Sequence, residues 1–171
     1  MRQHSLVFLV LVIPLLVPLD AWLFWNENSQ CPARNGTFPY YFGTSDLRCM
    51  VAQPIEHRRS ASSRYIWSWT HRFIQYRGKY FDFLGNSEVK ISSSRLNGHV
   101  CSGHMEKEPA GYSQLSLHCV EGCAKNYPCE YGKYKFVWNN CHQFTNRLSE
   151  VLCKSGNRCP LWCLRNCTLE G

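Results

Sequence analysis

The sequence predicts a single α+β domain in which a small antiparallel sheet is packed by an amphipathic helix. The first observation is an aromatic and β-branched run over residues 65–85, broken only by Arg77-Gly78, which is typical of a β-hairpin. The second is the helical spacing of apolar residues over 141–153. The third is the presence of 11 cysteines in 171 residues, a density that predicts a fold stapled by disulfides in an oxidising compartment.

Residues 1–21 are expected to be a signal peptide. A single basic residue precedes a nearly uninterrupted apolar run over residues 6–19, and the small residue Ala21 follows, which is the order of a cleaved secretory leader. A signal anchor is the alternative, because extension of the apolar run through Trp25 gives a length that could span a bilayer. Asp20 and two prolines interrupt that longer run, so the sequence favours secretion without a stable membrane span after processing.

The remaining chain, 22–171, is long enough to bury a core and shows no internal repeat or long linker, so one domain is expected. We expect an N-terminal segment of irregular structure or short strands over 22–64 and the main body of the domain over 65–171. Two sequons begin at Asn35 and Asn166, and these asparagines are candidate glycosylation sites.

The charge of the chain is basic, with 19 Lys and Arg against 12 Asp and Glu and a formal net charge of +7. One interpretation is a solvated basic surface, and the other is attraction to anionic lipid, glycan or nucleic acid. The basic residues are scattered, and no nucleic-acid-binding motif is present. The sequence therefore favours the first interpretation, and we expect no nucleic-acid partner.

The hairpin brings together a histidine and a carboxylate. A two-residue turn at Arg77-Gly78 pairs residue 76 with 79 and residue 71 with 84, which makes His71 and Asp82 diagonal neighbours on one face of the sheet. A carboxylate that holds an imidazole ring is the arrangement that orients a general base. The alternative is a half-buried structural histidine with Asp82 in solvent.

A short strand over 134–138 is expected to lead directly into the helix over 141–153. Aromatic residues alternate with others in the strand, and Asn139 and Asn140 are suited to cap the first free N–H groups of the helix. One helical face that begins at Cys141 carries the apolar residues, so the thiol points toward the core. The apolar residues of that face are Phe144, Leu148, Val151 and Leu152.

Cys141 therefore has the environment of a nucleophile. The unpaired N–H groups and the positive dipole end of a helix start lower the pKa of a thiol and raise its thiolate fraction. An odd number of cysteines also leaves one without an intramolecular partner, and we assign that place to Cys141. The alternatives are an ordinary buried thiol and a disulfide.

The other cysteines are expected to form disulfides, with Cys31 and Cys49 as one candidate pair. A short helix that includes Leu115 and Val120 is expected to end near Gly122 or Lys125. Two groups of residues have spacings found in zinc sites, but in an oxidising compartment these spacings indicate disulfides first, so we expect no metal and no cofactor. The groups are His118, Cys119, Cys123 and Cys129, and Cys159, Cys163 and Cys167.

Two motifs resemble those of the PPPDE family, the papain-like thiol hydrolases that include the deSUMOylating isopeptidases. The first is the histidine-led hairpin HRFIQYRGKYFDFLG over 71–85. The second is the helix start NNCHQFTN over 139–146, followed by PLW over 160–162. Histidine precedes cysteine in the chain, the reverse of the order in papain, as in this permuted branch of the fold. His142-Gln143 stands where the family has an Asn-His pair.

The resemblance implies a permuted papain-like fold and a catalytic dyad, with His71 as the base and Cys141 as the nucleophile. Asp82 would orient His71, and the Cys141 backbone N–H, at the helix start capped by Asn140, would help to bind the oxyanion. The chain is more distantly similar to the lecithin:retinol acyltransferase-like lipid enzymes, whose second histidine would fall near Phe83.

We therefore expect a secreted, extracellular cysteine hydrolase that acts on an amide, isopeptide or thioester bond of a protein or acyl substrate. One alternative is a non-catalytic secreted module on the same fold, for binding or as a toxin-like scaffold, which the density of cysteines favours. The other is a lipid acyltransferase or phospholipase. A disulfide at Cys141 would favour the binding module, because a nucleophile must be free.

Overall fold

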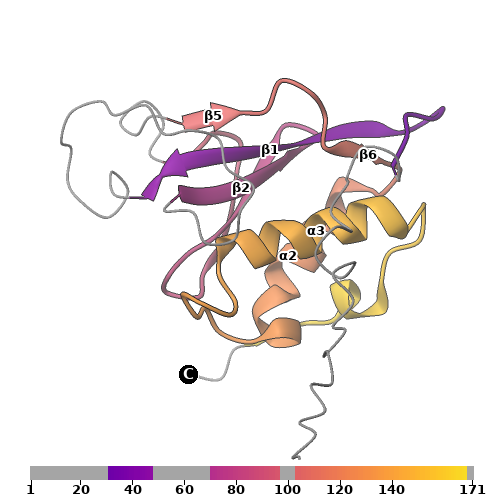
Figure 1. Ribbon diagram of the computed structural model, residues 1–171. Coiled ribbons are helices and arrows are strands. Elements are labelled where there is room, and N and C mark those ends of the chain that lie inside the picture. The colour runs from indigo at the N-terminus through magenta and orange to yellow at the C-terminus, as the bar shows by residue number, and fades with distance from the viewer. Residues whose placement is uncertain (1–30, 48–69, 97–102, 169–171) are drawn as a thin grey trace, which may run out of the picture.

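A computed structural model describes residues 31–47, 70–96 and 103–168, and the expected signal peptide over 1–21 lies outside these ranges. The described chain is an α+β fold, as the sequence predicts, with an antiparallel sheet and two α-helices (Figure 1). Its elements are β1 (Phe38–Asp46), β2 (Thr70–Tyr76), β3 (Lys79–Phe83), β4 (Val89–Ser92), β5 (Gly103–Met105), β6 (Gly111–Ser113), α2 (Leu117–Tyr131), α3 (Cys141–Lys154) and the 3-10 helix η2 (Leu161–Leu164).

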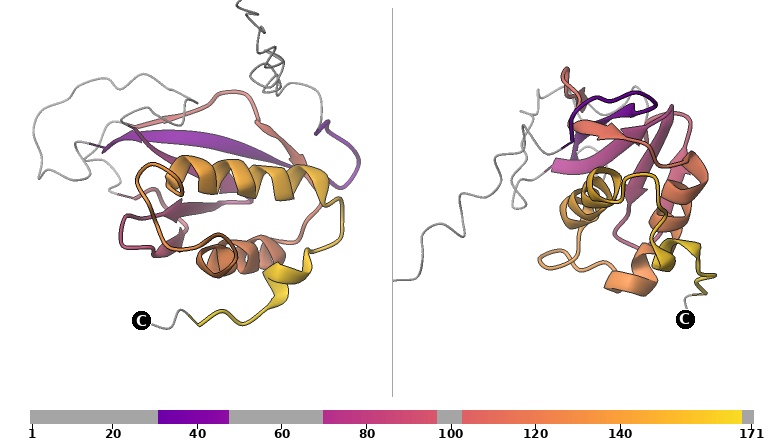
Figure 2. Two further views of the ribbon diagram at one scale, coloured as in Figure 1. Left: turned by 60° about the horizontal axis from the view of Figure 1, so that its bottom comes forward. Right: turned by 90° about the vertical axis from the view of Figure 1, so that its right-hand side faces the viewer.

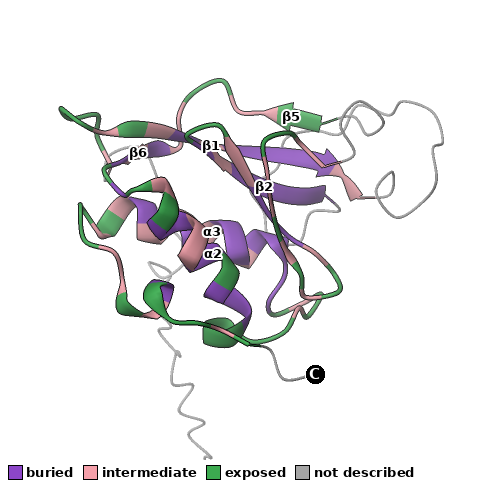
Figure 3. Ribbon diagram, turned by 180° about the vertical axis from the view of Figure 1, so that it is seen from behind, coloured by how far each residue is buried: buried purple, intermediate pink, exposed green. Residues whose placement is uncertain are grey.

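The sheet and the helices form two layers. The strand order is β4-β3-β2-β1-β5, and β6 pairs with β1 beside β5. Both helices lie on the same side of the sheet (Figure 2), and α3 packs mainly against β2. The residues of the hydrophobic core lie between these two layers (Figure 3), so the core is formed by one face of the sheet and the inner faces of the helices.

The hairpin of β2 and β3 has the register that the sequence predicts. Tyr76 pairs with Lys79, and Ile74 pairs with Phe81. The two turn residues, Arg77 and Gly78, have φ values of 47° and 78°. Two positive φ angles are the conformation of a type I′ turn, whose twist matches that of the strands. This turn fixes the register of the hairpin and therefore which residues of β3 lie next to His71 on β2.

β1 is a strand of nine residues in a segment where the sequence predicted irregular structure or short strands. It pairs with β2 from Tyr40↔Tyr76 to Asp46↔Thr70. A Cβ at Gly43 would overlap the ring of Phe73, so glycine, which usually weakens a strand, here permits close packing across the pair. The predicted Cys31–Cys49 pair is wrong, because Cys31 is bonded to Cys153; Cys49 lies outside the described residues.

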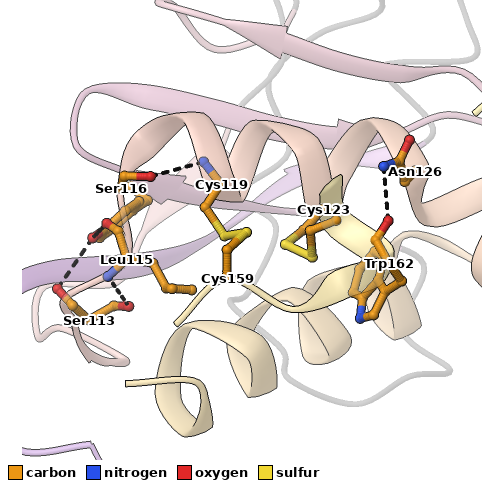
Figure 4. Close-up of a disulfide and its surroundings, with 10 residues drawn as sticks. Ser113, Leu115, Ser116, Cys119, Cys123, Asn126, Cys159 and Trp162 are labelled. Carbon is orange, nitrogen blue, oxygen red and sulfur yellow. Dashed lines mark hydrogen bonds between the residues drawn. A yellow bond between two sulfur atoms is a disulfide. The ribbon is translucent and has the colours of Figure 1, made fainter. Parts of the chain in front are cut away.

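α2 is longer than predicted and does not end at Gly122 or Lys125. Instead, Gly122 lets the helix approach η2, because a Cβ there would overlap the carbonyl oxygen of Cys163. Three disulfides join α2 to the C-terminal tail, two of them in consecutive turns (Figure 4). They are Cys119–Cys159, Cys123–Cys163 and Cys129–Cys167. The tail is therefore a covalent part of the helical layer.

The predicted helix after residue 140 is present as α3, but the predicted strand over 134–138 is absent. The segment folds into a tight turn closed by an isolated bridge between Lys135 and Asn139. The Asn139 amide donates to the Gly132 carbonyl at 2.8 Å, and the Asn140 amide donates to the Phe136 carbonyl at 2.7 Å. These side chains satisfy the backbone locally, and a strand ladder does not form.

No helix in the described part of the chain is long and apolar enough to cross a membrane.

Candidate active site

Three residues of the predicted site meet where the N-terminus of α3 approaches the sheet. His71 lies on β2, Asp82 lies on β3 and Cys141 is the first residue of α3. His71 Nε2 lies 2.7 Å from Asp82 Oδ1, as expected for diagonal neighbours in the observed register. The exposed fractions are 4% for His71 and 1% for Asp82. The structure thus replaces the alternative of an Asp82 in solvent with a buried pair.

Cys141 is buried and is the free thiol of the described residues. Its sulfur interacts with the ring of His71, and because Nε2 of that ring is directed at Asp82, Nδ1 is the nitrogen left for the thiol. The backbone N–H of Arg72 and the hydroxyl of Tyr134 also lie near the sulfur and favour its charged form. Three donors around one sulfur are an environment that stabilises a thiolate.

The charges of His71 and Cys141 stabilise each other. Burial by itself lowers the pKa of His71, but the hydrogen bonds and charges of Asp82 and Cys141 outweigh burial and raise that pKa to about 9. Burial likewise raises the pKa of the Cys141 thiol, but His71, the Arg72 N–H and Tyr134 together lower it below its ordinary value. These opposite shifts favour a thiolate–imidazolium pair at neutral pH.

Asn140 caps α3 as predicted. Its side-chain oxygen accepts from the N–H of His142 at 2.8 Å and from the N–H of Gln143 at 3.4 Å. The Gln143 side chain accepts from the Asn140 N–H at 3.1 Å and completes a capping box. The cap occupies the second and third N–H groups of the helix, and the first N–H group, that of Cys141, is not used by the cap. This N–H group is the predicted oxyanion donor.

Tyr134 is a site residue that sequence reasoning missed, because the aromatic alternation assigned it to a strand. Its ring centroid lies 5.2 Å from that of Phe83, and its N–H donates to Ser87 Oγ at 2.8 Å. Burial and the nearby Cys141 raise the pKa of Tyr134 to about 12. The hydroxyl therefore stays protonated and can donate to the thiolate. Its position depends on the turn over 135–139, which no periodicity indicated.

His142 follows the nucleophile directly but has a different role from His71. It is buried, and Nε2 lies 2.8 Å from the Thr70 carbonyl oxygen, to which it donates. Burial is the largest influence on the pKa of His142 and lowers it, so the ring is neutral at neutral pH. Arg72 adds a second link between β2 and α3, because its Nη1 donates to Asn146 Oδ1 at 2.8 Å. These contacts hold the first turns of α3 against the strand that carries His71.

The spacings reminiscent of zinc sites are occupied by disulfides. The sulfur atoms of Cys119, Cys123 and Cys159 lie within 4.8 Å of one another, but Cys119 is bonded to Cys159 and Cys123 to Cys163. Disulfide sulfurs are not thiolates, which are the form that binds zinc. These cysteines therefore link α2 to the tail by disulfides, as the sequence predicted for an oxidising compartment.

Both sequon asparagines are accessible. Asn35 precedes β1 and Asn166 follows η2, and both side chains are exposed. Neither lies on an element that carries His71, Asp82 or Cys141, so a glycan at either place is compatible with the cluster described above.

The candidate site is therefore a buried Asp82–His71–Cys141 chain, with Tyr134 and two backbone N–H groups directed at or next to the sulfur. Comparison of the chain with models of known families, with curated proteins and with solved structures gave no match.

Proposed function

We propose that this chain is a secreted thiol hydrolase of permuted papain-like fold. The proposal rests on three buried groups in successive contact. Asp82 is hydrogen-bonded to His71, and His71 interacts with the free thiol of Cys141. A nucleophile, a base and a group that orients the base are the minimum set for covalent catalysis by a thiol. Eight cysteines of the described residues form disulfides, which fits an oxidising, extracellular location.

The geometry supports acyl transfer in two steps. The Cys141 thiolate attacks the carbonyl carbon of an amide, isopeptide or thioester, and the carbonyl oxygen becomes an oxyanion that accepts from the Cys141 backbone N–H. The oxyanion collapses and the bond to the leaving group breaks. His71 gives its proton to the nitrogen or sulfur atom of the leaving group. Water then attacks the acyl-enzyme thioester and gives a proton to His71. The carboxylic acid leaves, and the thiolate–imidazolium pair is restored.

The proposed papain-like fold is supported by chain order and by position. The histidine lies on a strand that precedes the cysteine helix, and the helix begins next to that strand with a capped N-terminus. Phe83 lies fully in the core, where a lecithin:retinol acyltransferase-like enzyme would need a second polar histidine. This environment favours the hydrolase over the lipid acyltransferase.

The experiment is to measure hydrolysis of a panel of amide, isopeptide and thioester substrates by the full chain and by Cys141→Ala. We expect the variant to lose activity by at least about 10³-fold, because removal of a covalent nucleophile leaves only binding and oxyanion contacts. A Ser149→Ala variant on the same helix is the matched control and should keep its activity. Equal turnover by Cys141→Ala and the original chain would refute the proposal.

A non-catalytic binding module is the second candidate, and one observation favours it. A groove of ≈ 320 Å³ lies between α2 and the C-terminal tail, with His118, Lys125 and Arg165 among its lining residues. These residues belong to the disulfide-linked part of the molecule and include none of the Asp82–His71–Cys141 cluster. An inert Cys141 together with a ligand bound in this groove would favour the binding module.

A further inference from the structure

The loop between α2 and α3 displays aromatic side chains immediately before the helix that carries Cys141. Trp138 is 78% exposed and Phe136 is 58% exposed. With Val137 between them, they form three consecutive apolar residues at the tip of a turn. Runs of apolar residues at a surface cost solvation free energy and usually mark a site of interaction. The loop projects at the end of the molecule where α3 begins (Figure 2).

Hydrogen bonds hold the loop in this shape. Lys135 and Asn139 exchange backbone hydrogen bonds of 2.9 Å in both directions. The Asn140 side chain donates to the Phe136 carbonyl at 2.7 Å, and Tyr134 is fixed through its N–H to Ser87 Oγ at 2.8 Å. The ends of the turn are therefore held while the tip reaches into solvent. This arrangement presents the tip in one orientation, which lowers the entropic cost of binding.

The charge of the loop has one sign. Lys133 and Lys135 are exposed, and no acidic residue occurs between Glu130 and Glu150. Those two carboxylates face other cations, since Glu130 lies 3.5 Å from Arg165 and Glu150 pairs with residues of α3. Neither Lys133 nor Lys135 takes part in an ion pair among the described residues. The aromatic tip is thus flanked by positive charge that no ion pair among the described residues neutralises.

We propose that the loop over 132–139 docks on a membrane surface that contains anionic phospholipid. Trp138 enters the headgroup region, where its amphipathic ring is favoured, Phe136 adds an apolar ring, and Lys133 and Lys135 face the lipid phosphates. A specific protein interface buries roughly 800 Å² on each side. A tip of three apolar residues is small for such an interface, which favours a lipid surface over a protein partner. The net charge of +7 contributes attraction of the same sign.

Docking in this way would bring the N-terminus of α3 to the membrane. Cys141 follows the loop directly, so the proposed nucleophile would meet acyl groups or proteins held at the lipid surface. The docking itself rests on exposure and charge and does not require the proposed hydrolase to be correct. A Cys141→Ala chain should therefore bind vesicles as the original chain does.

The test is cosedimentation of the full chain with phosphatidylcholine vesicles that do or do not contain phosphatidylserine. Trp138→Ala should weaken binding roughly tenfold, because an apolar side chain no longer enters the lipid. Replacement of both Lys133 and Lys135 by Gln should weaken binding to the anionic vesicles by roughly 20- to 30-fold and change binding to neutral vesicles little. The apolar residues 6–19 are the same in every variant, so differences between variants report the loop.

Two matched controls lie outside the loop. Leu161→Ala removes an apolar side chain that is 80% exposed on η2, and Lys107→Gln removes an exposed lysine between β5 and β6. Neither should weaken binding by more than about twofold. Brominated phospholipid should quench Trp fluorescence in the original chain and quench it less in Trp138→Phe. Loop variants that bind as the original chain does, or controls that lose as much as the loop variants, would overturn the proposal.

Discussion

Helices α2 and α3 both place a cysteine in the first turn, yet only one of these sulfurs is free. Cys119 is the third residue of α2, whose N-cap Ser116 accepts from the Cys119 N–H at 3.2 Å. Cys141 is the first residue of α3, which Asn140 caps. Both sulfurs are buried. The positive end of a helix dipole acts on each of them, so the dipole by itself does not distinguish a nucleophile from a structural cysteine.

The neighbours across the fold make the difference. Cys119 faces the tail and is bonded to Cys159 (Figure 4). Cys141 faces the sheet, where His71 interacts with its sulfur; Tyr134 of the preceding loop also interacts with it, and no second cysteine is bonded to it. The comparison teaches that a cysteine at a helix start becomes a candidate nucleophile when the facing element supplies a base in place of a thiol.

The largest expected difference is between the contributions of two disulfides to the free energy of unfolding. Replacement of Cys31 and Cys153 by Ala opens a link across 122 residues and should lower the free energy of unfolding by about 4 kcal/mol. Replacement of Cys119 and Cys159 should cost less, about 1–2 kcal/mol, because Cys123–Cys163 still closes nearly the same loop. Urea denaturation of each double variant under oxidising conditions measures both values. Equal losses would contradict the view that the three links of α2 act together.

The next effect concerns reactivity. A stoichiometric dose of iodoacetamide on the native chain should label Cys141 alone among the described cysteines, since the others are disulfide-bonded. His71→Ala should reduce the labelling rate at pH 7 by about tenfold or more, because loss of the imidazolium raises the pKa of the thiol. Asp82→Asn should reduce it less. His118→Gln is the control and should leave the rate nearly unchanged, since His118 is exposed on α2.

The same pair gives a pH dependence of definite sign. The folded-state pKa of His71 is raised from 6.5 to about 9. The protonated ring therefore contributes stability that is fully present below pH 6.5 and is lost as the pH rises through about 9. The difference in unfolding free energy between the original chain and His71→Ala should shrink across that window. A difference that grows with pH would show that His71 is not held in its protonated form.

The smallest effect compares the two caps. Ser116→Ala and Asn140→Ala should each lower the free energy of unfolding by about 1 kcal/mol, the usual value of a lost N-cap. Only Asn140→Ala should also slow the labelling of Cys141, because Asn140 fixes both the start of α3 and the turn that holds Tyr134. Thermal unfolding and iodoacetamide labelling of both variants test this. A similar slowing in Ser116→Ala would remove the distinction between the two helices.

Local patterns predicted the parts of the fold whose partners are near in sequence. The turn at Arg77-Gly78 fixes the hairpin register within a few residues, and the apolar spacing after Cys141 fixes the face of α3. The strand predicted over 134–138 was wrong, since alternation of aromatic residues also occurs in a turn whose side chains are exposed. α2 was predicted too short, because Gly122 signals a helix end locally but serves a close contact with the tail.

The sequence by itself determined the α+β class, the pairing of β2 with β3, the capped start of α3 and, from an odd number of cysteines, at least one without an intramolecular partner. Only the tertiary structure decided which cysteines join, that Tyr134 contacts the thiol, and that Asp82 is buried against His71. The physical reason is range. Hydrophobic period, turn conformation and capping act over a few residues, whereas Cys31 meets Cys153 across 122 positions, a contact that depends on how the sheet and the helices pack together.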